Sequence, residues 1–150
     1  MKSVFQNKIF QFSKKPILIG ALLFISTIIE IYWSMGNFSE QMSSGNPDAS
    51  FFDDAYLMSL FTTVFLVFLF LLLSLIKNNY LKITLQLLLL ILVWFFWNYT
   101  IFVDRESSWS TYTFKEELLY TLSVSVFPTL TLSIITVFVL NYILKSHEIK

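Results

Sequence analysis

Four long apolar stretches alternate with short polar segments along the whole chain. The stretches cover about residues 17–36, 55–76, 81–103 and 118–144. A helix rises about 1.5 Å per residue, so roughly twenty apolar residues cross the ~30 Å hydrocarbon core of a bilayer. The pattern therefore predicts an all-α membrane protein with four transmembrane helices, organised as a single domain of residues 1–150.

Charged residues are sorted between two sets of polar segments. Residues 1–16, the turn 77–82 and the tail after Leu144 hold eight of the ten basic residues, whereas segments 37–54 and 104–117 hold eight of the ten acidic residues. Basic residues of membrane proteins collect on the cytoplasmic side. We therefore expect an antiparallel four-helix bundle with both termini in the cytoplasm, located in the inner (cytoplasmic) membrane of a bacterium.

The first residues of the chain have an amphipathic pattern. Phe5, Ile9 and Phe12 fall on one helical face, with most of the lysines elsewhere. This arrangement is typical of a helix that lies against the anionic inner leaflet, so we expect residues 1–16 to be an interfacial segment. Pro16 is expected at the start of the first span, where a proline loses no helical hydrogen bond.

Acidic residues stand where two of the helices are expected to begin. Asp53 precedes the second span, and Glu116 completes the S/T-x-x-E capping pattern that starts at Thr113. A carboxylate at a helix start stabilises the helix by about 0.3–1 kcal/mol. We favour this role over a catalytic acid pair. Asp53 and Glu116 are also candidates, with Asp48 and Glu106, for binding a basic partner.

The turn between the second and third spans is short. It consists of residues 77–80, which makes those two helices antiparallel neighbours. Asn78 and Asn79 suit the left-handed backbone conformation that such a turn often needs.

All four tryptophans fall toward the side of the bundle that carries the acidic loops. They are Trp33, Trp94, Trp97 and Trp109. Tryptophan side chains settle at the headgroup level, so most of this distribution is an interface belt. The aromatic block from Trp94 to Tyr99 is denser than anchoring requires, and its rings point all around the helix. Trp94, Trp97 and Trp109 are therefore candidates for binding a partner protein.

Glu30 is the one charged residue in the interior of an expected span, since Lys82 stands at the very start of the third. An ionised carboxylate there costs several kcal/mol unless it is paired, hydrated or protonated. Two interpretations stay open. Glu30, with Trp33 one turn away, is a proton or cation site or a contact with another protein's helix. Alternatively, it forms structural hydrogen bonds with Asn98 or with a hydroxyl of the fourth span.

The fourth span carries hydroxyl groups at helical spacing. They belong to Thr121, Ser125, Thr129, Ser133 and Thr136. Spacings of four and three residues place them on one face, which we expect to turn toward protein rather than lipid. We favour packing over a permeation path, which would normally need more charge and more glycine. Gln86 and Asn98 share roughly one face of the third span, which should also turn inward.

Several kinds of chemistry are excluded. The chain has no cysteine, and its single histidine, His147, has no partner at metal-ligand spacing. We therefore expect no metal site, no haem and no other cofactor. No nucleophile–base pair and no phosphate-cradling glycine loop are present, so the chain is not expected to be an enzyme.

In its architecture the chain resembles the immunity proteins of pore-forming colicins of the A, B and N type. The resemblance is carried by four spans, two longer acidic outer loops, a tight cytoplasmic turn and a lysine-tipped tail. Proteins of that family sit in the producer's inner membrane and block the toxin's pore-forming domain there. The resemblance covers the whole chain but involves no sequence motif, so it transfers no functional residues.

A small integral membrane binding protein is the function that we expect. Its partners would be the lipid bilayer and another membrane protein or membrane-inserted toxin, with no nucleic acid. Two alternatives stay open. One is an accessory or assembly subunit of a larger membrane complex, whose neighbours would bury the bulky aromatic surface. The other is a small oligomeric transporter or channel built around Glu30 and the hydroxyl groups of the fourth span.

Overall fold

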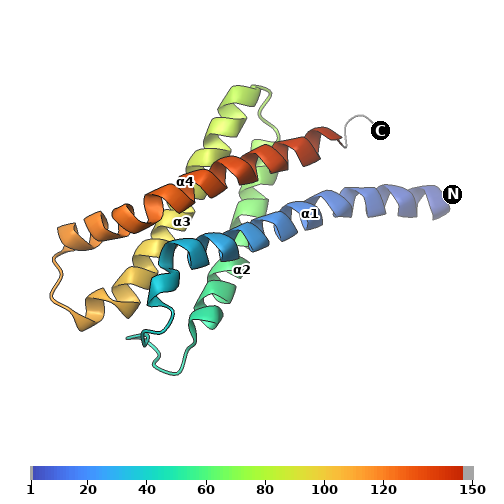
Figure 1. Ribbon diagram of the computed structural model, residues 1–150. Coiled ribbons are helices and arrows are strands. Elements are labelled where there is room, and N and C mark those ends of the chain that lie inside the picture. The colour runs from blue at the N-terminus through green and yellow to red at the C-terminus, as the bar shows by residue number, and fades with distance from the viewer. Residues whose placement is uncertain (1, 147–150) are drawn as a thin grey trace.

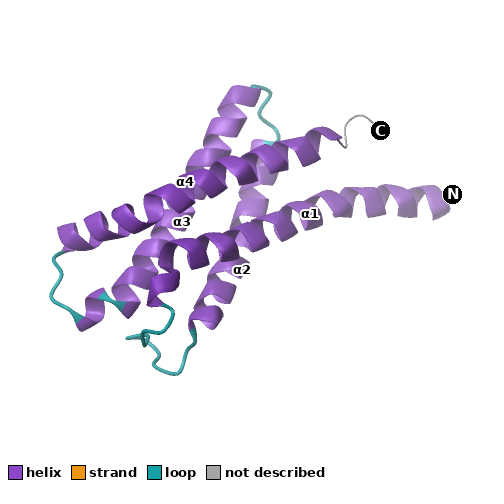
Figure 2. Ribbon diagram, in the orientation of Figure 1, coloured by secondary structure: helices purple, strands orange, loops and turns teal. Residues whose placement is uncertain are grey.

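The computed structural model describes the backbone of residues 2–146 and the side chains of residues 16–143. The described backbone is helical, with no strand (Figure 2). The helices are α1 (Lys2–Met35), α2 (Phe51–Leu73), α3 (Asn79–Arg105) and α4 (Phe114–Ser146), with short 3-10 turns at Gly36–Phe38 and Ser107–Trp109. Each of the four is long and apolar enough to cross a membrane, which confirms the four expected spans and indicates an integral membrane protein.

The helices pack as two pairs in two layers. Figure 1 shows α1 beside α4 in the nearer layer and α2 beside α3 behind them. Both α1 and α3 contact all three other helices. Loops 36–50 and 106–113 meet at one end of the structure. We call this the acidic end, meaning these two loops and the helix turns that adjoin them.

Capping boxes begin α2 and α4. The Ser50 hydroxyl accepts a hydrogen bond from the backbone N–H of Asp53 at 3.2 Å, and the Asp53 carboxylate accepts one from the Ser50 N–H at 3.1 Å. Glu116 accepts from the Thr113 N–H at 2.8 Å in the same way. The helix-start role predicted for Asp53 and Glu116 is therefore confirmed. Because Ser50 caps it, α2 begins earlier than the predicted residue 55. The helix also ends earlier than predicted, at Leu73 instead of residue 76.

Two expectations about helix ends are wrong. Pro16 begins the first candidate membrane span, Pro16–Phe38, as expected, but it does not begin a helix, because α1 continues from Lys2 through the proline. Asn78 is not left-handed: its φ is −78°, and its side chain caps α3 by accepting from the Tyr80 N–H at 3.0 Å. Capping needs a residue with an extended backbone, so it excludes the left-handed conformation. The amphipathic face predicted for residues 1–16 lies outside the described side chains.

The core consists of two apolar clusters with a polar layer between them. The cluster away from the acidic end contains Ile19, Leu23, Leu66, Phe70, Leu90, Trp94, Val137 and Leu140. The cluster beneath the acidic end contains Ile31, Met35, Phe38, Phe51, Ala55, Ile101 and Phe102. Between them lie the buried polar side chains of Thr27, Glu30, Thr62, Asn98 and Thr129.

One face of α3 is buried from Gln86 to the end of the helix at Arg105. Its buried residues recur about every four positions and include Gln86, Leu90, Trp94, Asn98 and Arg105. This spacing places them on one helical face. The prediction that Gln86 and Asn98 both turn inward is confirmed, since neither is exposed.

Polar side chains of α3 link it to its neighbours. The Trp94 indole donates to the Thr27 hydroxyl of α1 at 3.0 Å, and the Trp97 indole donates to the Thr62 hydroxyl of α2 at 2.7 Å. Nearer the chain termini, Asn141 of α4 donates to the side-chain carbonyl of Gln86 at 3.1 Å. Because directional bonds reach each neighbour, α3 sets the rotation of the other helices.

Replacing Trp94 tests this arrangement. Trp94 is 0 % exposed, so Trp94→Ala leaves a large cavity and should lower the free energy of unfolding by about 3–5 kcal/mol. The matched control is Phe68→Ala on α2, whose ring is 62 % exposed and should cost far less. Unfolding in mixed micelles of increasing denaturing detergent measures both variants. Equal losses for the two would contradict the core position of Trp94.

Candidate functional site

Glu30 lies at the centre of the polar layer and is 0 % exposed. Its Oε1 atom accepts three hydrogen bonds. The donors are the hydroxyl of Ser34 at 2.8 Å, Nδ2 of Asn98 at 2.8 Å and the hydroxyl of Thr129 at 2.6 Å. The structural interpretation of Glu30 offered Asn98 or a hydroxyl of the fourth span as the partner, and both bonds are present. One oxygen atom thus joins α1, α3 and α4. We call these four residues the Glu30 cluster.

The second carboxylate oxygen is different. Oε2 of Glu30 is buried and has no hydrogen-bond partner, and the same holds for Oδ1 of Asn98. The one ion pair among the described side chains joins Arg105 to Asp54, so no basic group there neutralises Glu30. In the cluster, Oε1 of Glu30 therefore accepts three hydrogen bonds, whereas two buried acceptors, Oε2 of Glu30 and Oδ1 of Asn98, have no donor.

The five hydroxyl groups that share one face of α4 are all buried. Thr121, Ser125, Thr129, Ser133 and Thr136 are each at most 3 % exposed, so this face of α4 turns toward protein as predicted. Ser125 donates to the carbonyl of Thr121 at 2.7 Å, within the same helix. Thr129 is the member that bonds Glu30. This helix face thus contributes close packing and one bond to the cluster.

Trp33 does not join the Glu30 cluster. Its side chain is half exposed, and its ring meets the edge of Phe127 with centroids 6.0 Å apart. The structure therefore places Trp33 at the α1–α4 surface rather than beside the carboxylate.

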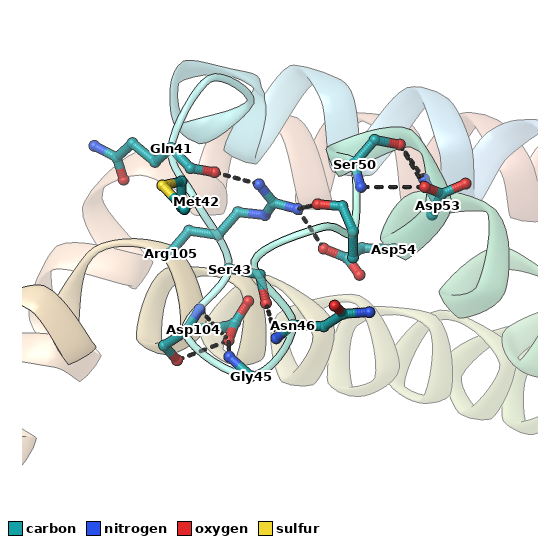
Figure 3. A network of polar contacts seen from close by, with 12 residues as sticks. Gln41, Met42, Ser43, Gly45, Asn46, Ser50, Asp53, Asp54, Asp104 and Arg105 are labelled. Carbon is teal, nitrogen blue, oxygen red and sulfur yellow. Dashed lines mark hydrogen bonds and ion pairs between the residues drawn. The ribbon is translucent and has the colours of Figure 1, made fainter.

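Arg105 organises the acidic end. It is only 2 % exposed, and its Nη2 atom lies 2.6 Å from Oδ2 of Asp54 at the start of α2 (Figure 3). Its guanidinium also donates to the backbone carbonyls of Gln41 and, at 3.4 Å, of Ala49. The same group lies 5.3 Å from the ring centroid of Phe51. One arginine therefore ties both ends of loop 36–50 to α2 and α3.

Asp104 holds the tip of the same loop. Its Oδ1 atom accepts from the backbone N–H groups of Ser44 and Gly45, at 3.1 and 3.0 Å, and from the Ser44 hydroxyl at 2.9 Å (Figure 3). A carboxylate that binds two successive N–H groups fixes the loop backbone. Loop 36–50 is therefore docked along its length by the end of α3.

The second loop adds two more contacts. Gln41 donates from its side chain to Glu106 at 2.8 Å, and the Trp109 indole donates to the carbonyl of Met42 at 3.1 Å. The Trp109 and Met42 side chains nevertheless remain about 60 % exposed, at 61 % and 59 %. An apolar surface is therefore held in place between acidic residues.

The predicted partner-binding residues fall into different environments. Trp94 is in the core, and Trp97 is partly buried against α2, so neither presents a free aromatic face. Asp53 and Glu116 are exposed but serve as caps, and Glu106 is half buried. Asp48 is exposed, like Trp109, and the structure brings both to the acidic end.

Sequence reasoning missed the part that Arg105, Asp104 and Asp54 play. From the sequence, these three residues count only among the charges of segments 37–54 and 104–117. An available signal is the Asp–Arg pair directly at the end of an apolar run, because arginine has five donors with which to satisfy the carbonyls of a folded loop.

Removing Arg105 should release the loop. Arg105→Ala leaves the Asp54 charge and two loop carbonyls without their donor, which should cost about 3 kcal/mol of stability. Arg105→Lys should rescue little, because one ammonium group does not reproduce the guanidinium fork. The measurement is hydrogen exchange at the Ser44 and Gly45 amides, which should accelerate. Lys115→Ala, which removes an exposed base from the same end, is the control. Unchanged exchange in both Arg105 variants would show that the loop is held by other contacts.

Comparison with known proteins adds no relative for this chain. No family model matches it, and neither a curated protein nor a solved structure matches it. The features of this chain that bear on its function are the Glu30 cluster and the acidic end.

Proposed function

We propose that this chain is a small integral membrane binding protein that recognises another membrane-inserted protein through its acidic end. The specific role that we propose is immunity: the chain blocks a pore-forming bacteriocin or a contact-delivered toxin in the membrane. The observation that carries the proposal is the docked conformation of loop 36–50, which holds acidic and aromatic side chains in one place.

Preorganisation supports a binding role. Arg105 and Asp104 hold the loop before any partner arrives, so little conformational entropy is lost on association. The exposed Trp109 and Met42 belong to residue types that are enriched in protein interfaces. A loop needed only to join two helices would not require so many bonds to a third one.

Charge indicates the kind of partner. The acidic end carries eight acidic and two basic residues, and one of these bases, Arg105, is already paired with Asp54. Glu40 and Asp48 are exposed and make no side-chain hydrogen bond to the described part of the chain. Such a surface attracts a basic partner and speeds its association.

The orientation that we propose follows from the same charges. The acidic end lies outside, and both termini lie in the cytoplasm, with the four helices as an antiparallel bundle in a bacterial inner membrane. The lysine-rich segments at the opposite end support this orientation.

Reporter fusions test the orientation. The positive-inside rule places the lysine-rich segments in the cytoplasm. After Lys150 we therefore expect activity from a reporter enzyme that works only in the cytoplasm, and none from a reporter that works only after export. At Ser44 we expect the opposite result. Matching signals from the two sites would exclude the four-span orientation.

Immunity is tested by challenge with toxin. Cells that express the chain are exposed to pore-forming bacteriocins, including any encoded beside its gene, and a potential-sensitive dye reports depolarisation of the inner membrane. Protection against one toxin, and not against others, is the expected result. Depolarisation by every toxin at normal levels of the chain would overturn the immunity role.

The two free acids should then control association with that toxin. Neutralising both, as Glu40→Gln with Asp48→Asn, should slow association by about threefold to tenfold and weaken its dependence on salt, while stability stays unchanged. Lys115→Gln, a control of opposite charge at the same end, should not slow it. Surface-based binding kinetics at two salt concentrations measure the effect. Wild-type kinetics in the double variant would exclude the acidic end as the docking surface.

A further inference from the structure

The two oxygens of the Glu30 carboxyl group have unequal environments. Oε1 accepts from Ser34, Asn98 and Thr129, whereas Oε2 accepts nothing. The two polar atoms of the Asn98 carboxamide are also unequal: Nδ2 donates to Oε1 of Glu30, whereas the buried Oδ1 accepts no hydrogen bond. The acid and the amide therefore already share one bond, and each has one acceptor left over.

No described charge compensates an ionised Glu30. α1 carries no other charged residue from Pro16 to Met35. The nearest charged groups along the packed helices are Asp54 on α2, Arg105 on α3 and Glu117 on α4. Arg105 pairs with Asp54 at 2.6 Å, and Glu117 accepts from the Tyr99 hydroxyl at 2.8 Å. An ionised Glu30 would thus be an unpaired charge in the interior, which is strongly unfavourable.

A proton on Oε2 removes both problems. The neutral acid carries no charge, and its O–H supplies the donor that the cluster lacks. An acid and a primary amide that already share an N–H···O bond close a ring when the acid O–H donates to the amide oxygen. The single proton turns Oε2 of Glu30 into a donor, and Oδ1 of Asn98 accepts its hydrogen bond. Neither of the two leftover atoms is then without a partner, so this bond defines where the proton lies.

We propose that the Glu30 cluster is a proton-binding site, in which the neutral Glu30 side chain and the Asn98 carboxamide form a cyclic pair. Nδ2 of Asn98 donates to Oε1, and the proton on Oε2 is donated to Oδ1. The hydroxyls of Ser34 and Thr129 also donate to Oε1, the carbonyl oxygen of the acid. The bound proton thereby holds α1, α3 and α4 together, independently of what the acidic end binds.

Infrared spectroscopy detects the proton directly. The wild-type protein in bilayers at neutral pH should show the carbonyl stretching band of a protonated carboxylic acid, and Glu30→Gln should lack it. Ser34→Ala should keep the band and move it to higher frequency, because the carbonyl oxygen loses one of its three donors. A wild-type spectrum without the band would overturn the proposal.

Stability against pH gives a second measurement. The folded chain keeps the proton that the unfolded carboxylate releases, so raising the pH should increase the unfolding equilibrium constant by up to tenfold per pH unit, until the folded state also releases its proton. Glu30→Gln mimics the neutral acid, so it should remain abundant in the membrane and lose this dependence. Glu30→Leu should lower abundance, because Asn98 loses its partner. Identical pH profiles for wild type and Glu30→Gln would overturn the proposal, whatever the outcome of the toxin challenge.

Discussion

The hydrogen bonds that converge on Oε1 of Glu30 are the interaction on which the helix arrangement depends. Apolar side chains pack against lipid tails about as well as against one another, so apolar burial alone does not decide how membrane helices are rotated or shifted. Directional bonds do. Ser34, Asn98 and Thr129 reach one atom only when α1, α3 and α4 have a single mutual register. The apolar clusters on either side can then interlock.

Within that register, α3 connects the core to the acidic end. Its buried face supplies Trp94 and Asn98 to the bundle interior, and its last turns supply Asp104 and Arg105 to loop 36–50. The recognition surface that we propose is thus an extension of the same rigid helix. Because the loop is bonded to the end of α3, the position of this helix in the bundle fixes the position of the loop.

The two polar regions have different requirements. In the Glu30 cluster every side chain is buried, so removing one of them leaves its partners on the other helices without a hydrogen bond. At the acidic end, the exposed side chains of Glu40 and Asp48 make no hydrogen bond to the described part of the chain, so replacing them should leave the fold intact. The surface charge of the acidic end can therefore change while the interior stays constant.

The sequence by itself determined the four spans, the caps at Asp53 and Glu116, and the inward faces of α3 and α4, because periodicity and capping act over a few residues. It left open which groups meet Glu30, whose partners Asn98 and Thr129 lie 68 and 99 residues away. Only the tertiary structure decided that, since the rotation of each helix depends on all of its neighbours. For the same reason, only the tertiary structure shows that Trp94 is buried, that Trp109 is exposed and that Arg105 holds the loop.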